Sequence, residues 1–101
     1  MTEDSRVVRN RILKILYEKH PNWTDDMELW VELGDLNCEI SADRLASELI
    51  YLRDVPEKAK GYVELQIKTV RGEKYPQSRI TPLGIDLYEK AVPADPRIAP
   101  F

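Results

Sequence analysis

The strongest structural signal in this chain lies in residues 41–91, SADRLASELIYLRDVPEKAKGYVELQIKTVRGEKYPQSRITPLGIDLYEKA. The segment opens on Ser41, a residue type that favours the N-cap position of a helix. Ile40 before this cap and Leu45 after it have the spacing of a hydrophobic staple. Further leucines follow at helical spacing, so we expect a helix from Ser41 to Arg53.

A β-hairpin and another helix follow in the same segment. Residues 62–69 alternate apolar and polar side chains, as a half-buried strand does. Gly72 marks the turn, and residues 77–81 supply the return strand. The pair Thr81-Pro82 combines a favoured N-cap with a proline at the first helical position, so we expect a helix up to about Val92. The predicted order is helix, hairpin, helix.

Two further helices are predicted before this segment. Apolar residues recur at helical spacing over residues 4–18, and Pro21 prevents that helix from continuing. Thr24 is a candidate N-cap for the second helix, and Gly34 is a natural end for it. The buried stripe expected on this second helix consists of Met27, Trp30, Val31 and Leu33.

The C-terminal end has a different character. Residues 93–101 contain three prolines and cannot form a regular helix or a central strand. We therefore expect one domain over residues 1–92 and a proline-rich extended arm over residues 93–101. The arm carries two apolar side chains, Ile98 and Phe101. The sequence leaves open whether they fold back on their own domain, dock on a second protomer or belong to a disordered tail.

Length and composition indicate a single soluble domain. The chain has 101 residues, with 43% apolar and 33% charged side chains, which is typical of globular proteins. No apolar run approaches the ~20 residues of a membrane-spanning helix, and the polar N-terminus does not resemble a secretory signal. Cys38 is the only cysteine and His20 the only histidine, so we expect no disulfide and no metal site. We expect a cytoplasmic protein without a cofactor, and not an enzyme.

Charges are segregated along the chain, although the net charge is only −3. Residues 22–54 carry nine acids and two bases, Arg44 and Arg53. Residues 55–81 carry six bases and three acids. Such asymmetry says more about partners than the total charge does, because opposite surfaces attract opposite partners.

Two junctions resemble winged helix-turn-helix proteins. Residues 48–53 followed by 60–65 resemble the passage from the recognition helix to the wing, and residues 79–84 resemble the junction between the wing and the last helix. The layout is similar to that of PadR-type and MarR-type repressors over about residues 5–92. It implies an α+β fold, with a three-helix core, a β-hairpin wing and a C-terminal helix. Residues 55–59 depart from it as an apparent insertion.

A weaker likeness concerns the whole chain. Its length and its proline-rich end are similar to those of small winged-helix proteins of Mu-like phages. No function follows from that likeness.

The winged-helix resemblance implies double-stranded DNA as the partner and regulation of transcription as the role. The solvent-side positions expected on the helix over residues 41–53 are Ala42, Asp43, Arg44, Ser47, Glu48 and Tyr51. The predicted DNA-binding residues are Arg44, Ser47, Tyr51, Lys68, Arg71, Lys74 and Arg79. Arg44 and Ser47 would contact bases, and Glu48 could accept from cytosine. Lys68, Arg71 and Lys74 would contact phosphates. Solubility alone is the competing explanation for a basic hairpin.

The alternative hypothesis is a protein-interaction module that does not bind DNA. Its acidic face over residues 22–54 would meet a basic protein partner. In either case a homodimer is expected, formed through the first helix, the last helix or the C-terminal arm. Acids that flank Arg44 would favour the interaction module, whereas a continuous positive surface over the wing and first helix would favour DNA binding.

Overall fold

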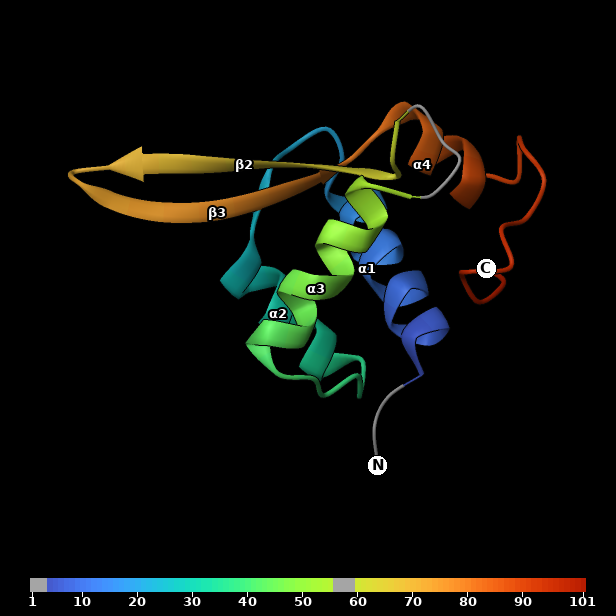
Figure 1. Ribbon diagram of the computed structural model, residues 1–101, viewed down its shortest axis with the longest axis horizontal. Helices are drawn as coiled ribbons and strands as arrows, with labels where there is room; N and C mark the ends of the chain where they lie inside the picture. The colour runs from blue at the N-terminus through green and yellow to red at the C-terminus, as the bar shows by residue number, and fades with distance from the viewer. Residues whose placement is uncertain (1–3, 56–59) are drawn as a thin grey trace.

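The computed structural model describes residues 4–55 and 60–101 (Figure 1). These residues form an α+β fold with four helices and one antiparallel sheet of three strands, in the order β1-β3-β2. The apparent insertion over residues 55–59 falls outside the described residues except for Val55, which is buried. In the described part of the chain, no helix is long and apolar enough to cross a membrane.

The first and third helices both have side-chain caps at their N-termini. Helix α1 (Ser5–Lys19) starts after Asp4, whose side chain accepts a hydrogen bond from the Arg6 N–H at 2.8 Å. Helix α3 (Ala42–Arg53) starts after Ser41, whose hydroxyl accepts from the Arg44 N–H at 3.1 Å. The predicted start and end of α3 are both confirmed, because cap chemistry is local and can be read directly from the sequence.

The start of the second helix was predicted wrongly. Thr24 does not cap it: Thr24 is buried in a short strand, β1 (Thr24–Asp25), where it lies opposite Ser78. Helix α2 (Asp26–Asp35) begins after Asp25, whose side chain makes no cap hydrogen bond. Two residues are too short a strand to leave an alternating pattern, so the third strand of the sheet has no sequence signal.

Helix α2 ends in a Schellman motif one residue beyond Gly34. Asn37 has a φ of 59°, in the left-handed region that asparagine tolerates. Its N–H donates to the Gly34 carbonyl at 3.0 Å, and the Cys38 N–H donates to the Leu33 carbonyl at 2.9 Å. Cys38 and Leu33 are both buried, so Cys38 serves as the apolar residue that closes the motif.

The buried face of α2 also differs from the predicted stripe. Leu29 and Leu33 are fully buried, four residues apart on one face. Met27, Trp30 and Val31 are instead 69%, 40% and 52% exposed. Helix α2 carries apolar residues on two faces, and only contact with the rest of the fold selects the one that enters the core.

The hairpin is longer than predicted and extends well beyond the body of the molecule (Figure 1). It pairs β2 (Val63–Val70) with β3 (Glu73–Ile80) through a two-residue turn. Arg71 and Gly72 in this turn have φ values of 51° and 81°. Two central residues of positive φ define a tight turn whose twist matches that of the flanking strands.

The last helix is shorter than predicted. Helix α4 (Pro82–Tyr88) has the expected cap, with the Thr81 hydroxyl accepting from the Gly84 N–H at 3.1 Å. It stops well before Val92 because Lys90 adopts a φ of 62°. The Lys90 N–H donates to the Leu87 carbonyl and the Ala91 N–H to the Asp86 carbonyl, which is a second Schellman motif.

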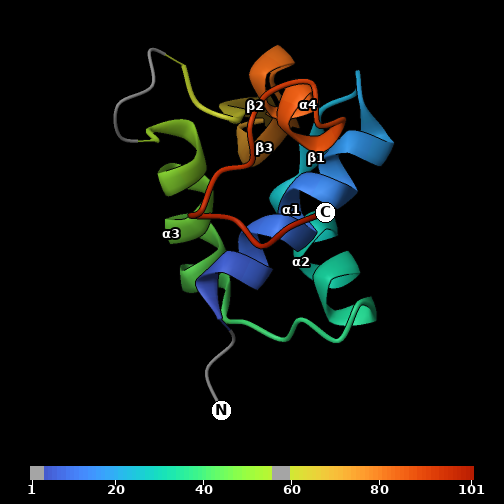
Figure 2. The ribbon, with the colours of Figure 1, turned by 90° about the vertical axis from the view of Figure 1, so that its right-hand side faces the viewer.

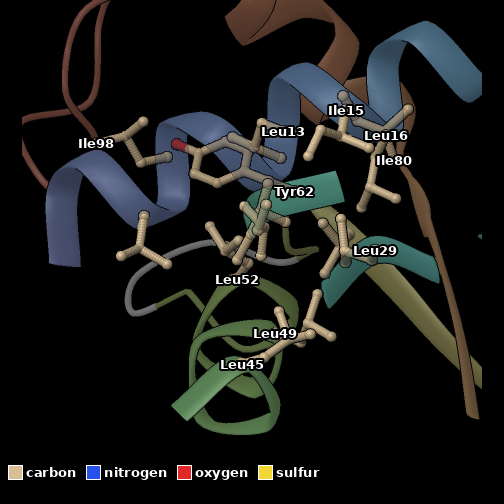
Figure 3. Packing of buried hydrophobic residues seen from close by; sticks show 14 of the residues in the cluster. Leu13, Ile15, Leu16, Leu29, Leu45, Leu49, Leu52, Tyr62, Ile80 and Ile98 are labelled. Carbon is tan, nitrogen blue, oxygen red and sulfur yellow. The ribbon is translucent and has the colours of Figure 1, made fainter. Parts of the chain in front are cut away.

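The core lies where α1 crosses the other elements (Figure 3). Each neighbouring element contributes apolar side chains to it, and Tyr62 inserts its ring among them. All the residues labelled in Figure 3 are buried, and those that are at most 1% exposed are Leu13, Leu16, Leu29, Leu49, Leu52 and Ile80.

The C-terminal arm folds back across α1 (Figure 2). The Ala99 N–H donates to the Arg6 carbonyl at 3.0 Å, and the Asn10 side chain donates to the Ala99 and Pro100 carbonyls. Ile98 is buried in the core cluster. The sequence left three alternatives open for the arm, and the structure shows the first of them: the arm packs on its own domain. It covers part of α1, one of the surfaces expected to mediate a dimer.

Candidate nucleic-acid interface

The two faces of the hairpin point to opposite sides of the molecule. Residues directly opposite one another in an antiparallel pair share a face, and the faces alternate along each strand. The face that continues from the core toward α3, called the α3 side, carries Leu65, Ile67, Thr69, Lys74 and Pro76. The opposite face, called the outer side, carries Gln66, Lys68, Val70, Glu73, Tyr75 and Gln77.

This alternation separates the basic residues predicted to contact phosphate. Lys74 lies on the α3 side, Lys68 lies on the outer side and Arg71 occupies the turn between the strands. All three are exposed and form no ion pair among the described residues. Because they lie on different faces, one duplex lying against the α3 side would meet Arg71 and Lys74 more readily than Lys68.

Arg79 is engaged by its neighbours. Its guanidinium forms an ion pair with Glu64 at 2.6 Å, directly across the hairpin. The same group lies over the ring of Trp23, 4.3 Å from the ring centroid. An arginine held by a carboxylate and an aromatic face is less available to a phosphate, because the carboxylate already offsets its charge.

Arg44 turns toward α1 rather than toward solvent. One guanidinium nitrogen donates to the Ser5 hydroxyl at 3.1 Å and lies 3.8 Å from Glu48. Arg9 of α1 forms a closer pair with Glu48, at 3.0 Å. The predicted solvent-side position of Glu48 is therefore wrong: its side chain is only 7% exposed and bridges two arginines between α1 and α3.

Tyr51 is likewise drawn toward α1. It is half-buried, and the Arg9 guanidinium lies 3.7 Å from its ring centroid. Arg44, Glu48 and Tyr51 thus line one seam between two helices. A helical periodicity shows which residues share a face, but not which of two polar faces another helix covers.

Ser47 remains on the exposed face of α3. The exposed positions of this helix are Ala42, Asp43, Ala46, Ser47, Ile50 and Arg53. Arg53 is the cation among them, and it donates twice to the neighbouring Asp54, at 2.8 and 3.1 Å. Those hydrogen bonds hold the pKa of the Asp54 carboxyl below its ordinary value. The outward face of α3 therefore offers few donors to base edges.

A hollow separates α3 from the hairpin. Ile50 and Arg53 line one wall, and Ile67 and Pro76 line the other. Asp26 also lines it, and burial raises the pKa of the Asp26 carboxyl. The surface that would approach a duplex is thus apolar in part and includes an acid.

On the outer side, a ladder of polar side chains crosses the three strands. Gln66 donates to the Gln77 side chain at 2.7 Å, and Gln77 donates to Asp25 at 2.6 Å. Asp25 lies in β1, which the sequence did not predict, so this ladder had no sequence signal. It fixes the base of the hairpin and satisfies the polar groups there.

Trp30 has a structural role. Trp30 donates its indole N–H to the Ile40 carbonyl at 2.7 Å, which fixes the connection between α2 and α3. In the described part of the chain, no three His, Cys, Asp or Glu residues cluster as a metal site would require.

Neither a comparison with protein-family models nor a comparison with curated proteins finds a match.

Proposed function

We propose that this chain is a small winged-helix DNA-binding protein whose hairpin, rather than α3, contacts the phosphate backbone. The element order supports the winged-helix layout: three helices, a long hairpin and a final helix. Regulation of transcription is the role that this layout suggests, by analogy with proteins of similar arrangement.

The observation that carries the proposal is the pair of cations at the end of the hairpin. Arg71 and Lys74 are exposed, form no ion pair among the described residues and project beyond the body of the molecule (Figure 1). Cations of this kind bind phosphate by displacing condensed counterions, without reading sequence. Among the exposed side chains of α3, Ser47 and the paired Arg53 are the hydrogen-bond donors, so we expect little discrimination between sequences.

The test combines two substitutions that preserve the hairpin. Arg71→Asn removes the charge and leaves Asn-Gly, the pair most favoured in this type of turn. Lys74→Gln removes the second charge. A labelled duplex is titrated by fluorescence anisotropy at several salt concentrations. The double variant should lower the slope of log Kobs against log salt by about two, one unit for each lost phosphate contact.

Lys90→Asn is the matched control. Lys90 also has a positive φ and an exposed charge, but it follows α4, at the opposite end of the molecule from the hairpin turn (Figure 1). This variant should bind the duplex as the unchanged protein does. Failure of the unchanged protein to bind at low salt would refute the proposal, as would a salt slope that the double substitution leaves intact.

A second candidate function is a protein-interaction module. It is supported by the exposed apolar residues of α2, Met27, Trp30 and Val31, within an acidic segment. Such a surface suits a basic partner with apolar anchors better than it suits a polyanion. Val31→Lys should abolish binding of such a partner while leaving the duplex titration unchanged.

A further inference from the structure

An apolar stripe runs along the outward face of α2. Met27, Trp30, Val31 and Gly34 have the i, i+3, i+4, i+7 spacing of one helical face. The three side chains are all more than a third exposed. Beside the stripe lies a hollow lined by Trp30, Val31, Gly34, Cys38, Glu39 and Ile40. Contiguous exposed apolar surface of this kind is a feature of interaction sites.

Acidic side chains predominate around this stripe. Residues 26–39 contain five acids and no lysine or arginine. Glu28 and Glu32 share Lys19 of α1 as a partner, at 3.0 Å each. Asp35 and Glu39 are exposed and form no ion pair among the described residues. An occupant of the stripe should therefore bring apolar side chains together with lysine or arginine.

The outer side of the hairpin has the complementary chemistry. Val70 and Tyr75 are 42% and 43% exposed, and together with Lys68, Gln77 and the acid Asp25 they line a shallow hollow, in which Gln77 donates a hydrogen bond to Asp25. Lys68 lies directly opposite Tyr75, and Arg71 follows in the turn. The outer side near the turn, counted with the turn itself, carries two bases, Lys68 and Arg71, and one acid, Glu73. An aromatic ring with Lys68 opposite it and Arg71 in the adjoining turn, near the end of a projecting hairpin, is suited to cover an apolar surface rimmed by carboxylates.

We propose that the α2 stripe is the docking site for the outer side of the hairpin of a second copy of this chain. Tyr75 and Val70 of one copy pack on Trp30 and Val31 of the other. Lys68 and Arg71 then lie near Asp35 and Glu39. In a closed pair the contact is made twice, once in each direction, so neither copy leaves its stripe or its hairpin uncovered.

Charge favours docking of the hairpin over a dimer in which the two α2 stripes meet each other. Two copies that met stripe to stripe would bring the acids of both α2 helices together, and Lys19 of each copy would offset only part of that negative charge. Docking of the hairpin replaces that repulsion with attraction. The inference narrows the second candidate function to one partner, a second copy, and it does not depend on DNA binding.

A charge swap tests the contact. Lys68→Glu places an acid on the hairpin, and Asp35→Lys with Glu39→Lys places two cations beside the stripe. All three positions are on the surface, so the variants should fold as the unchanged protein does. The association constant is measured by sedimentation equilibrium at low salt. Each variant alone should associate at least about tenfold more weakly than the unchanged protein, because like charges now face each other.

An equimolar mixture of the two variants should recover dimerisation. In the mixed pair, the acidic hairpin meets the basic stripe, and the unchanged hairpin meets the unchanged stripe. Lys74→Glu is the matched control: it reverses a charge on the α3 side of the same hairpin and should leave the association constant within about twofold.

Three results would overturn the inference. The unchanged protein could remain monomeric at the highest accessible concentration, Lys68→Glu could dimerise normally, or the mixture could fail to recover association. None of them bears on the duplex titration, which is performed at concentrations where the protein is monomeric. Arg71 belongs to both proposed contacts, but Lys74 belongs to the duplex contact alone, and Lys68, Asp35 and Glu39 belong to self-association alone. Failure of self-association and failure of DNA binding are therefore separate observations.

Discussion

At the scale of single residues, polar side chains in this protein are directed by contacts that are distant in sequence. Arg44 has the residue type and helix position expected of a base-reading side chain, yet it is turned toward Ser5 and Glu48. Arg79 is similarly held by Glu64 and Trp23. Arg71 and Lys74 form no such ion pairs among the described residues, because the end of the hairpin lies beyond the body of the molecule (Figure 1). Position in the fold, more than residue type, sets which cations are available to a ligand.

Gly84 is a residue at which a single added methyl group should destabilise the protein. A Cβ there would lie 2.4 Å from the Tyr62 carbonyl oxygen and 2.7 Å from Cγ1 of Ile80. We expect Gly84→Ala to lower the free energy of unfolding by about 1–3 kcal/mol, because α4 must move away from the hairpin. Gly34→Ala is the matched control, since nothing lies within 4 Å of its Cβ position. This control should gain about 0.5–1 kcal/mol from helix propensity. Urea denaturation of both variants measures the difference, and equal stabilities would contradict the predicted close approach.

At the scale of elements, the boundaries predicted from the sequence were right where the signal is local. Ser41 and Thr81 accept cap hydrogen bonds from the third residue after them, so residue type and spacing suffice. The buried face of α2 could not be predicted, because apolar residues occupy both of its faces and α1 packs on only one. The outward face of α3 was misjudged for the same reason, since its polar residues include the buried Glu48.

The end of α4 could not be predicted from the sequence, because no glycine marks it. Lys90 holds the left-handed position of a Schellman motif that glycine usually occupies. A side chain with a Cβ costs roughly 1–2 kcal/mol in that conformation, and glycine has a greater entropy loss on folding. We expect Lys90→Gly to stabilise the protein by about 0.5–1 kcal/mol, measured by urea denaturation. Lys90→Ala removes the same charge but keeps a Cβ, and it should change the stability by less than about 0.5 kcal/mol. If glycine and alanine gave the same stability, the positive φ would not be the cause.

At the scale of the whole molecule, the C-terminal arm joins elements that are far apart in the chain. Asp95 is buried and accepts hydrogen bonds from the Tyr62 hydroxyl at 2.5 Å and from the Arg97 N–H at 2.9 Å. Arg6 and Arg9 of α1 donate to the Pro96 and Arg97 carbonyls. The arm thereby fastens the start of the hairpin to α1. Prolines predicted an extended segment here, but the carboxylate that tethers it gave no pattern by which it could be recognised.

Asp95 should make the stability of this assembly depend on pH. Burial opposes ionisation of its carboxyl, but the hydrogen bonds from Tyr62 and Arg97 prevail and hold its pKa below the ordinary value. A depressed pKa in the folded state means that ionised Asp95 stabilises the protein above about pH 4, and that this stabilisation is lost as the pH falls through the folded-state pKa. We therefore expect Asp95→Asn to lower the free energy of unfolding by about 1–3 kcal/mol at pH 7 and by clearly less at pH 3. Urea denaturation of both proteins at the two pH values measures the gap. Tyr62→Phe removes one hydrogen bond to the same carboxylate, and its deficit should also narrow in acid. A gap that stayed constant between pH 7 and pH 3 would show that Asp95 holds the arm by packing alone and not by its charge.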